Sequence, residues 1–185
     1  MLITVSGPPG SGTTTAAERV AARLEVALVP GGEVFRAMAV ERGMSLADFG
    51  RFAADHPEVD VELDTRLAAR ARAGDVLIES RLAGWIAHNE GLAAITVFLD
   101  CATDERARRV ADREDISLDR ARRDNDERQR VERDRYLALY GVDLDDLSIY
   151  DLVLDSGVLT PDDLADRIAA AARFRFGSRG TAGRA

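Results

Sequence analysis

The chain has 185 residues, enough for one domain whose core needs neither disulfides nor metal ions for stability. Hydrophobic residues make up 46% of it, and no apolar run approaches the roughly 20 residues that span a bilayer, which predicts a soluble protein without a membrane partner. Acidic residues outnumber basic ones by 33 to 25, and the net charge of -8 argues against a general nucleic-acid-binding protein.

The composition has two further features that bear on its environment. All 25 basic residues are arginine, and lysine is absent. Such an acidic, lysine-free composition is typical either of a salt-loaded cytoplasm or of a GC-rich genome, and we keep a halophilic source as a hypothesis. The only cysteine, Cys101, cannot form an intrachain disulfide and is expected to be a buried thiol. The first residues do not have the pattern of a secretory signal, so we expect a cytoplasmic protein.

The chain begins with an apolar segment over residues 2–6, a glycine-rich turn, and a helical pattern over residues 16–24. The turn matches the phosphate-binding pattern G-x-x-x-x-G-K-[ST] at every fixed position except the lysine, which is Thr13. Glycines let backbone N–H groups point at a phosphate, and the start of the following helix adds its positive dipole end. The residues expected to bind ATP are Gly7, Pro8, Pro9, Gly10, Ser11, Gly12, Thr13, Thr14 and Thr15.

The same loop predicts a metal ion. Thr14 occupies the position whose hydroxyl ligates Mg²⁺ beside bound ATP, so Mg²⁺ is the expected cofactor. The absent lysine would normally neutralise charge on the β- and γ-phosphates, so another cation must replace it. A purely structural glycine-rich turn is the alternative interpretation.

Strands and helices alternate through the rest of the chain. Apolar strands separated by helices predict a three-layer α/β fold with about five parallel strands covered by helices on both faces. The expected strands after the first are residues 26–29, 76–79, 94–99 and 150–154. The expected helices are residues 33–42, 45–54, 59–73 and 160–174. Residues 102–140 are arginine-rich and predict either a solvated helix pair or a mobile cover over phosphates.

Five segments together resemble the archaeal type of cytidylate kinase, one of the adenylate kinase-like nucleoside monophosphate kinases. They are GPPGSGTTT at 7–15, GGEVFRAMAVERGMSL at 31–46, HPEVD at 56–60, ESRLAGW at 79–85 and YGVDLDDLSIYDLV at 140–153. The resemblance covers about residues 2–172. In that family the loop commonly reads GTTT, so Thr13 is compatible with an active enzyme. Pro30 and Ser80 depart from the family pattern, and both are expected near the acceptor pocket.

The resemblance implies a single kinase domain of the P-loop NTPase fold over residues 1–176. Its core would comprise residues 1–30, 74–101 and 148–176, with a nucleoside monophosphate (NMP)-binding region at about 31–73, a lid at about 102–140 and a flexible tail at 177–185. It implies that a monomer transfers a phosphoryl group from ATP to CMP or dCMP. AMP or UMP as acceptor and a noncatalytic nucleotide-binding regulator remain alternatives, and net charge disfavours an RNA-binding module.

The resemblance also suggests which residues hold the acceptor and the metal ion. Gly32, Arg36 and Arg81 are expected to bind the acceptor, with a surface salt bridge as the alternative for Arg36. Arg81 follows a predicted strand, at the sheet edge where α/β proteins place ligands. Glu79 is expected to hold Mg²⁺ through water, and an ion pair with an arginine is the alternative.

Four arginines of the predicted lid are candidates to replace the missing lysine. Arg109 and Arg113 are four residues apart on one helix face, and Arg128 and Arg135 are seven residues apart on another. In related kinases the lid brings such arginines over the transferring phosphoryl group, where a guanidinium can bind two oxygens. We therefore expect these four residues to be catalytic.

Overall fold

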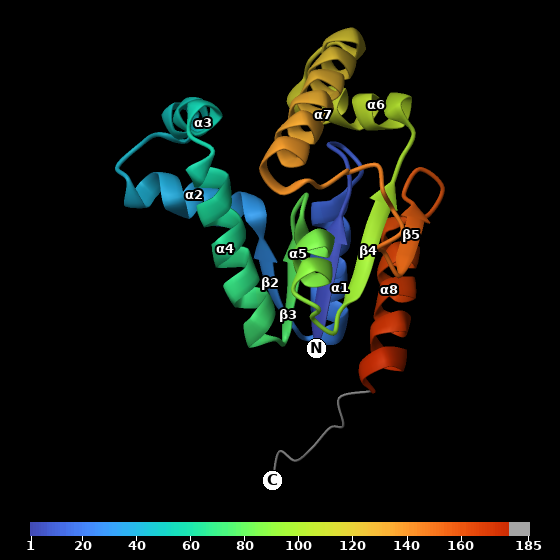
Figure 1. Cartoon of the computed structure of the whole chain (residues 1–185). Helices are drawn as coiled ribbons and strands as arrows, with labels where there is room; N and C mark the ends of the chain where they lie inside the picture. The colour runs from blue at the N-terminus through green and yellow to red at the C-terminus, as the bar shows by residue number, and fades with distance from the viewer. Residues whose placement is uncertain (178–185) are drawn as a thin grey trace.

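A five-stranded parallel sheet forms the centre of the protein in the computed structural model, which describes residues 1–177 (Figure 1). The strand order is β2-β3-β1-β4-β5, and every neighbouring pair is parallel. Almost all of the predicted flexible tail lies outside the described residues. The strands are β1 (Leu2–Ser6), β2 (Ala27–Pro30), β3 (Val76–Glu79), β4 (Ile95–Asp100) and β5 (Leu152–Asp155). The predicted α/β class with about five parallel strands is confirmed.

Helices cover both faces of the sheet because its strands are apolar on both sides. Ile3 and Val5 of β1 pack into a cluster with α1 (Thr13–Leu24) and α8 (Pro161–Phe176). Leu2 packs on the opposite face with α4 (Glu58–Ala73) and α5 (Ala83–Asn89). The result is the expected three-layer arrangement.

Two helical arms extend beyond the carboxyl ends of the strands, one on each side of β1 (Figure 1). The first arm comprises α2 (Gly31–Glu41), α3 (Leu46–Asp55) and the start of α4, around a small core that includes Phe49. The second arm comprises α6 (Thr103–Glu114) and α7 (Leu118–Tyr140), with a small core around Ala107. The arms place charged helices beside the sheet edge where the phosphate-binding pattern lies.

The structure differs from the predicted elements mainly at their ends and at α5. Helix α5 is only seven residues long and was not predicted, since Gly84 interrupts its pattern. A Cβ at Gly84 would lie 2.4 Å from the ring of Tyr150, so the glycine allows that ring to pack against the helix. The fifth strand was predicted to begin at Tyr150 but begins at Leu152. Tyr150 precedes the strand, and its ring packs against α5.

Within the described residues, no helix combines the length and apolar composition required to cross a membrane. Cys101 is buried and free, as predicted.

Candidate active site

The glycine-rich loop joins β1 to α1 at the carboxyl edge of the sheet and has a backbone that only glycine adopts easily. Gly10 and Gly12 have φ angles of 82° and 85°. A Cβ at Gly10 would lie 2.8 Å from the carbonyl oxygen of Arg106, so a larger residue would displace α6 or the loop. Arg106 is only 4% exposed and donates from Nη1 to the carbonyl oxygen of Pro9 at 3.3 Å. Sequence reasoning missed this buried arginine because nothing distinguishes it from its exposed neighbours.

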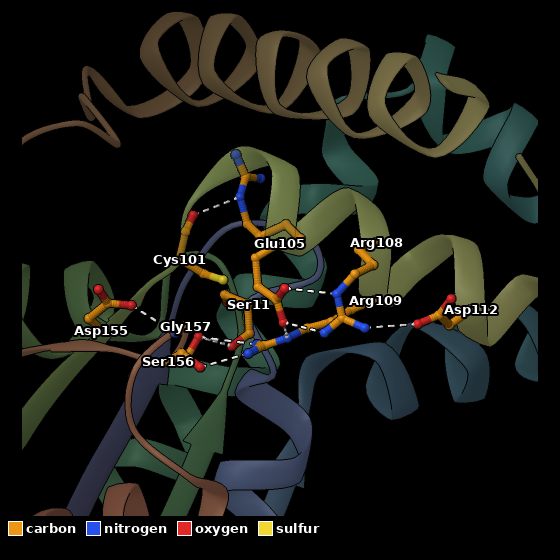
Figure 2. A network of polar contacts seen from close by, with 10 residues as sticks. Ser11, Cys101, Glu105, Arg108, Arg109, Asp112, Asp155, Ser156 and Gly157 are labelled. Carbon is orange, nitrogen blue, oxygen red and sulfur yellow. Dashed lines mark hydrogen bonds and ion pairs between the residues drawn. The ribbon is translucent and has the colours of Figure 1, made fainter. Parts of the chain in front are cut away.

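A second set of contacts holds the loop from the opposite side (Figure 2). Ser156, just after β5, donates from Oγ to the carbonyl oxygen of Ser11 at 2.7 Å. Arg109 donates from Nη2 to the carbonyl oxygen of Ser156 at 2.7 Å and from Nε to Glu105 at 2.8 Å. The guanidinium groups of Arg108 and Arg109 lower the pKa of Glu105 to about 2, so this anchor stays ionised. The structure therefore gives Arg109 protein partners on both sides.

Thr13, which replaces the expected lysine, points at an acidic residue. It is 7% exposed and donates from Oγ1 to Oε1 of Glu79 at 2.7 Å. Glu79 ends β3, in register with Val5 of β1. Among the described residues Glu79 has no ion pair, so the alternative pairing with an arginine is not observed. Its carboxylate instead lies in the same cavity as the exposed Thr14.

The oxygen atoms near the loop fit a magnesium ion that is held mainly by phosphates and water. Thr14 offers a hydroxyl and Glu79 a carboxylate, and both are hard oxygen donors. No three His, Cys, Asp or Glu side chains gather around one point in the described part of the chain. Such a sparse protein contribution is typical of Mg²⁺ bound together with a nucleotide, because Mg²⁺ keeps several waters.

A cavity of about 650 Å³ lies between the loop, the sheet edge and the two arms. It extends from the loop, past the start of α2, to a wall made by α3 and α4. The predicted residues that line it are Pro8, Gly10, Gly12, Thr13, Thr14, Thr15, Gly32, Glu79, Arg81, Arg109, Arg113, Arg128 and Arg135. Five arginines from three separate segments of the chain thus line one cavity. Their spacing in the sequence did not predict that they all meet there.

Four predicted residues lie outside this cavity. Gly7 and Pro9 line a second cavity, of about 510 Å³, on the other side of the loop. Ser11, a residue of the loop itself, is fully buried. Arg36 is exposed on α2 beside Gly32 and forms no ion pair with any described residue, so its alternative as a surface salt bridge is not observed.

A buried carboxylate on α7 holds two of the cavity arginines. Glu132 is 7% exposed and accepts from Nε of Arg81 at 2.7 Å and from Nε of Arg128 at 2.8 Å. Burial opposes its ionisation, but the two arginines outweigh burial and lower its pKa. Arg81 also donates to the carbonyl oxygen of Gly7. Through Arg81, Glu132 of α7 is thus linked to the glycine-rich loop. Arg113, by contrast, pairs with Glu114 at the surface.

A second acidic group lies at the far end of the cavity, on α4. Asp60 has its Oδ2 3.4 Å from Nε of Arg135, and Asp64 accepts from the hydroxyl of Tyr140 at 2.7 Å. Burial raises the pKa of Asp64 to about 6, although the Tyr140 hydrogen bond opposes the rise. Sequence reasoning assigned no role to either aspartate, although their spacing of four residues places them on one helix face.

The two departures from the family pattern lie at the ends of neighbouring strands, Pro30 as the last residue of β2 and Ser80 directly after β3. Ser80 lines the cavity, as expected, and its buried Oγ has no hydrogen-bond partner among the described residues. Pro30 does not line it; it ends β2 and precedes the first turn of α2. A Cβ at Gly31 would lie 3.0 Å from the Cβ of Ser80, so a glycine lets α2 begin close to β3.

Comparison with known proteins decides the family. The profile of the cytidylate kinase-like family matches residues 2–158. The chain belongs to the cytidylate kinase-like family. A cytidylate kinase from Pyrobaculum neutrophilum is 43% identical over 163 residues, which cover 88% of each chain. One from Halobacterium salinarum is 42% identical and covers 90% of this chain and 86% of its own.

Solved structures add the fold of this family member. Shikimate kinase from Bacteroides thetaiotaomicron superposes with a TM-score of 0.63 at 14% identity, over 94% of this chain and 97% of that one. At that identity the likeness concerns the fold alone, and it confirms the predicted kinase architecture. The resemblance to cytidylate kinases is likewise confirmed by the family match.

Proposed function

We propose that the protein transfers the terminal phosphoryl group of ATP to CMP, and also to dCMP, giving ADP and CDP or dCDP. Membership of the cytidylate kinase-like family supports this activity. The observation that carries the proposal is the single cavity that joins the glycine-rich loop to the first helical arm and is lined by five arginines. Two anionic substrates need such positive surroundings to approach each other.

The reaction needs positioning and charge neutralisation more than covalent help from the protein. The loop amides would hold the ATP phosphates, and the start of α2 with Gly32, Arg36 and Arg81 would hold the acceptor phosphate. An oxygen of that phosphate forms a bond to the γ-phosphorus while the bond to the β–γ bridging oxygen breaks. ADP leaves with the electron pair of the broken bond.

Thr14 and Glu79 would hold Mg²⁺, the former by its hydroxyl and the latter through water. The ion neutralises charge on the β- and γ-phosphates when it is bound. Thr13 contributes by fixing the Glu79 carboxylate through its hydrogen bond. In this proposal, the residue at the lysine position therefore orients a metal ligand and does not itself supply a cation.

The cation comes from the second arm in this proposal. Residues 102–140 act as a lid, residues 31–73 as the acceptor-binding region, and residues 1–30, 74–101 and 148–176 as the core. Arg113 and Arg128 would contact the transferring phosphoryl group, and Arg135, which lies 3.4 Å from Asp60, would add positive charge from the acceptor end of the cavity. Arg109 would act mainly by holding the loop, because Ser156 and Glu105 accept its hydrogen bonds.

The cellular setting is also part of the proposal. We propose a monomeric, cytoplasmic enzyme of an archaeal and salt-adapted source, acting on free nucleotides without a nucleic-acid or membrane partner. The lysine-free composition with net charge -8 supports salt adaptation. The relatives from Pyrobaculum and Halobacterium support an archaeal source.

An acceptor-profile assay tests the function. Release of ADP from Mg²⁺-ATP is measured with CMP, dCMP, UMP and AMP, and we expect the highest kcat/KM for CMP and dCMP. Arg128→Ala and Arg135→Ala should each lower turnover, and at least one of them should lower it on the order of 10³-fold. The control variant Arg120→Ala, on the exposed side of α7, should keep the turnover of the wild type. ADP release that no acceptor accelerates would indicate a regulator and overturn the proposal.

A further inference from the structure

Asp60, in the first turn of α4, has a buried acceptor atom without a hydrogen bond. The residue is 5% exposed and lines the cavity. Its Oδ2 receives no hydrogen bond from any described residue, and neither does Nε of Arg135, which lies 3.4 Å away. A buried carboxylate without a donor is costly. The Oδ2 atom of Asp60 therefore lacks a hydrogen-bond donor among the described residues.

The surroundings of Asp60 match the part of the cavity that a base would occupy. The acceptor phosphate must lie near the glycine-rich loop, so its base must extend away from the loop, toward α3 and α4. The apolar residues lining that end of the cavity are Phe35, Gly50, Ala53, Ala54 and Leu63. An apolar wall with a few polar groups is the usual form of a site for a small ring.

We propose that Asp60 accepts a hydrogen bond from the exocyclic amino group of the acceptor base and thereby selects cytosine over uracil. This inference rests on the proposed function. Cytosine presents an N4 amino donor, for which a carboxylate is the matching acceptor. Uracil presents the O4 acceptor at the same place, so two acceptors would face each other and leave a buried carboxylate without a donor.

The neighbouring groups favour Asp60 over Asp64 for this role. Asp64 already accepts from Tyr140, whereas Asp60 has only the ion pair with Arg135. Burial raises the pKa of Asp60, Arg135 opposes the rise and Glu132 adds to it. Arg135 therefore places a compensating positive charge beside the Asp60 carboxylate without donating a hydrogen bond to it. The carboxylate remains able to accept a hydrogen bond from the base.

The first test changes the substrate and leaves the protein intact. Wild-type kcat/KM is compared for CMP, UMP and the pyrimidin-2-one analogue of CMP, in which hydrogen replaces the amino group. We expect the analogue and UMP to fall below CMP by about tenfold or more. Equal values for CMP and the analogue would overturn the inference while leaving the kinase activity established. A wild-type protein that phosphorylates no acceptor would instead overturn the proposed function.

The second test combines these acceptors with Asp60→Ala and the isosteric Asp60→Asn. Asp60→Ala should lose activity with CMP and little with the analogue, so its preference for CMP should collapse toward unity. Asp60→Asn keeps a neutral acceptor oxygen and should lose less of that preference. The matched control is Asp55→Asn, an exposed carboxylate at the end of α3, which should retain the wild-type preference. If Asp60 only positions Arg135, kcat falls equally for every acceptor and the preference stays, which would refute base recognition. Circular dichroism and ATP affinity verify that each variant is folded.

Discussion

At the scale of single residues, the half-buried pair of Asp64 and Tyr140 makes stability depend on pH. Asp64 has a pKa of about 6 in the folded protein, against an ordinary value of 3.8, chiefly because burial disfavours its charge. The folded state therefore binds this proton more tightly than the unfolded state. The resulting stabilisation is complete below the unfolded pKa and is lost as pH rises through about 6.

Replacing this carboxyl should remove that pH dependence. Between about pH 4 and about pH 7, Asp64→Asn should gain about 2 kcal/mol in free energy of unfolding relative to wild type, at roughly 1.4 kcal/mol per pKa unit, because pH 4 already lies slightly above the ordinary pKa of 3.8. Urea unfolding at both pH values measures the difference. Parallel pH profiles for the two proteins would show that Asp64 does not titrate between them, and Asp55→Asn should follow wild type throughout.

At the scale of elements, polar side chains of α7 contact the residues that follow β3 and the helix α4. Glu132 binds Arg81 after β3, Arg135 pairs with Asp60 of α4, and Tyr140 donates to Asp64. One helix thus contacts both the phosphate end and the far end of the cavity. The carboxylate of Glu132 occupies guanidinium groups that the proposed reaction assigns to phosphates.

Removing the Glu132 charge should therefore have opposite effects on stability and on acceptor binding. We expect Glu132→Gln to lower the free energy of unfolding by about 2 kcal/mol, since it weakens two charged hydrogen bonds in a partly buried network. The KM for CMP should fall by about tenfold, because phosphate no longer competes with a carboxylate. Glu127→Gln, which affects only the exposed pair with Arg130, serves as control. An unchanged or higher KM in Glu132→Gln would contradict this competition.

Sequence patterns were sufficient for the strands and for the longer helices, but not for α5 or for the partners of charged residues. Apolar strands predicted the parallel sheet, and the two glycines predicted the loop, because both patterns are local. Glu132 and Glu127 both lie on an arginine-rich helix, yet only Glu132 is buried. That difference arises because α7 places Glu132 against Arg81, which follows β3, and no local spacing encodes this contact. Asp60 escaped notice for the same reason.

At the scale of the whole molecule, net charge should make stability depend on salt. With a net charge of -8, the excess acidic residues repel one another over distances at which salt screens the repulsion. Salt weakens contact ion pairs much less, because their atoms lie closer together than the Debye length, as in the pair of Arg23 with Asp162 at 2.6 Å. Raising salt from about 0.01 M to about 1 M shortens the Debye length from roughly 30 Å to 3 Å. We therefore expect the melting temperature to rise by several degrees. Equal melting temperatures would argue against salt adaptation.

The contacts of α7 also bear on what the protein does with ATP when no acceptor is present. Glu132 and Asp60 already engage the guanidinium groups of Arg81, Arg128 and Arg135. An ATP molecule that arrives alone would therefore meet cations neutralised by neighbouring carboxylates, and water would gain little help in attacking the γ-phosphate. The arrangement would limit idle hydrolysis until a second nucleotide displaces the Glu132 carboxylate from Arg81 and Arg128.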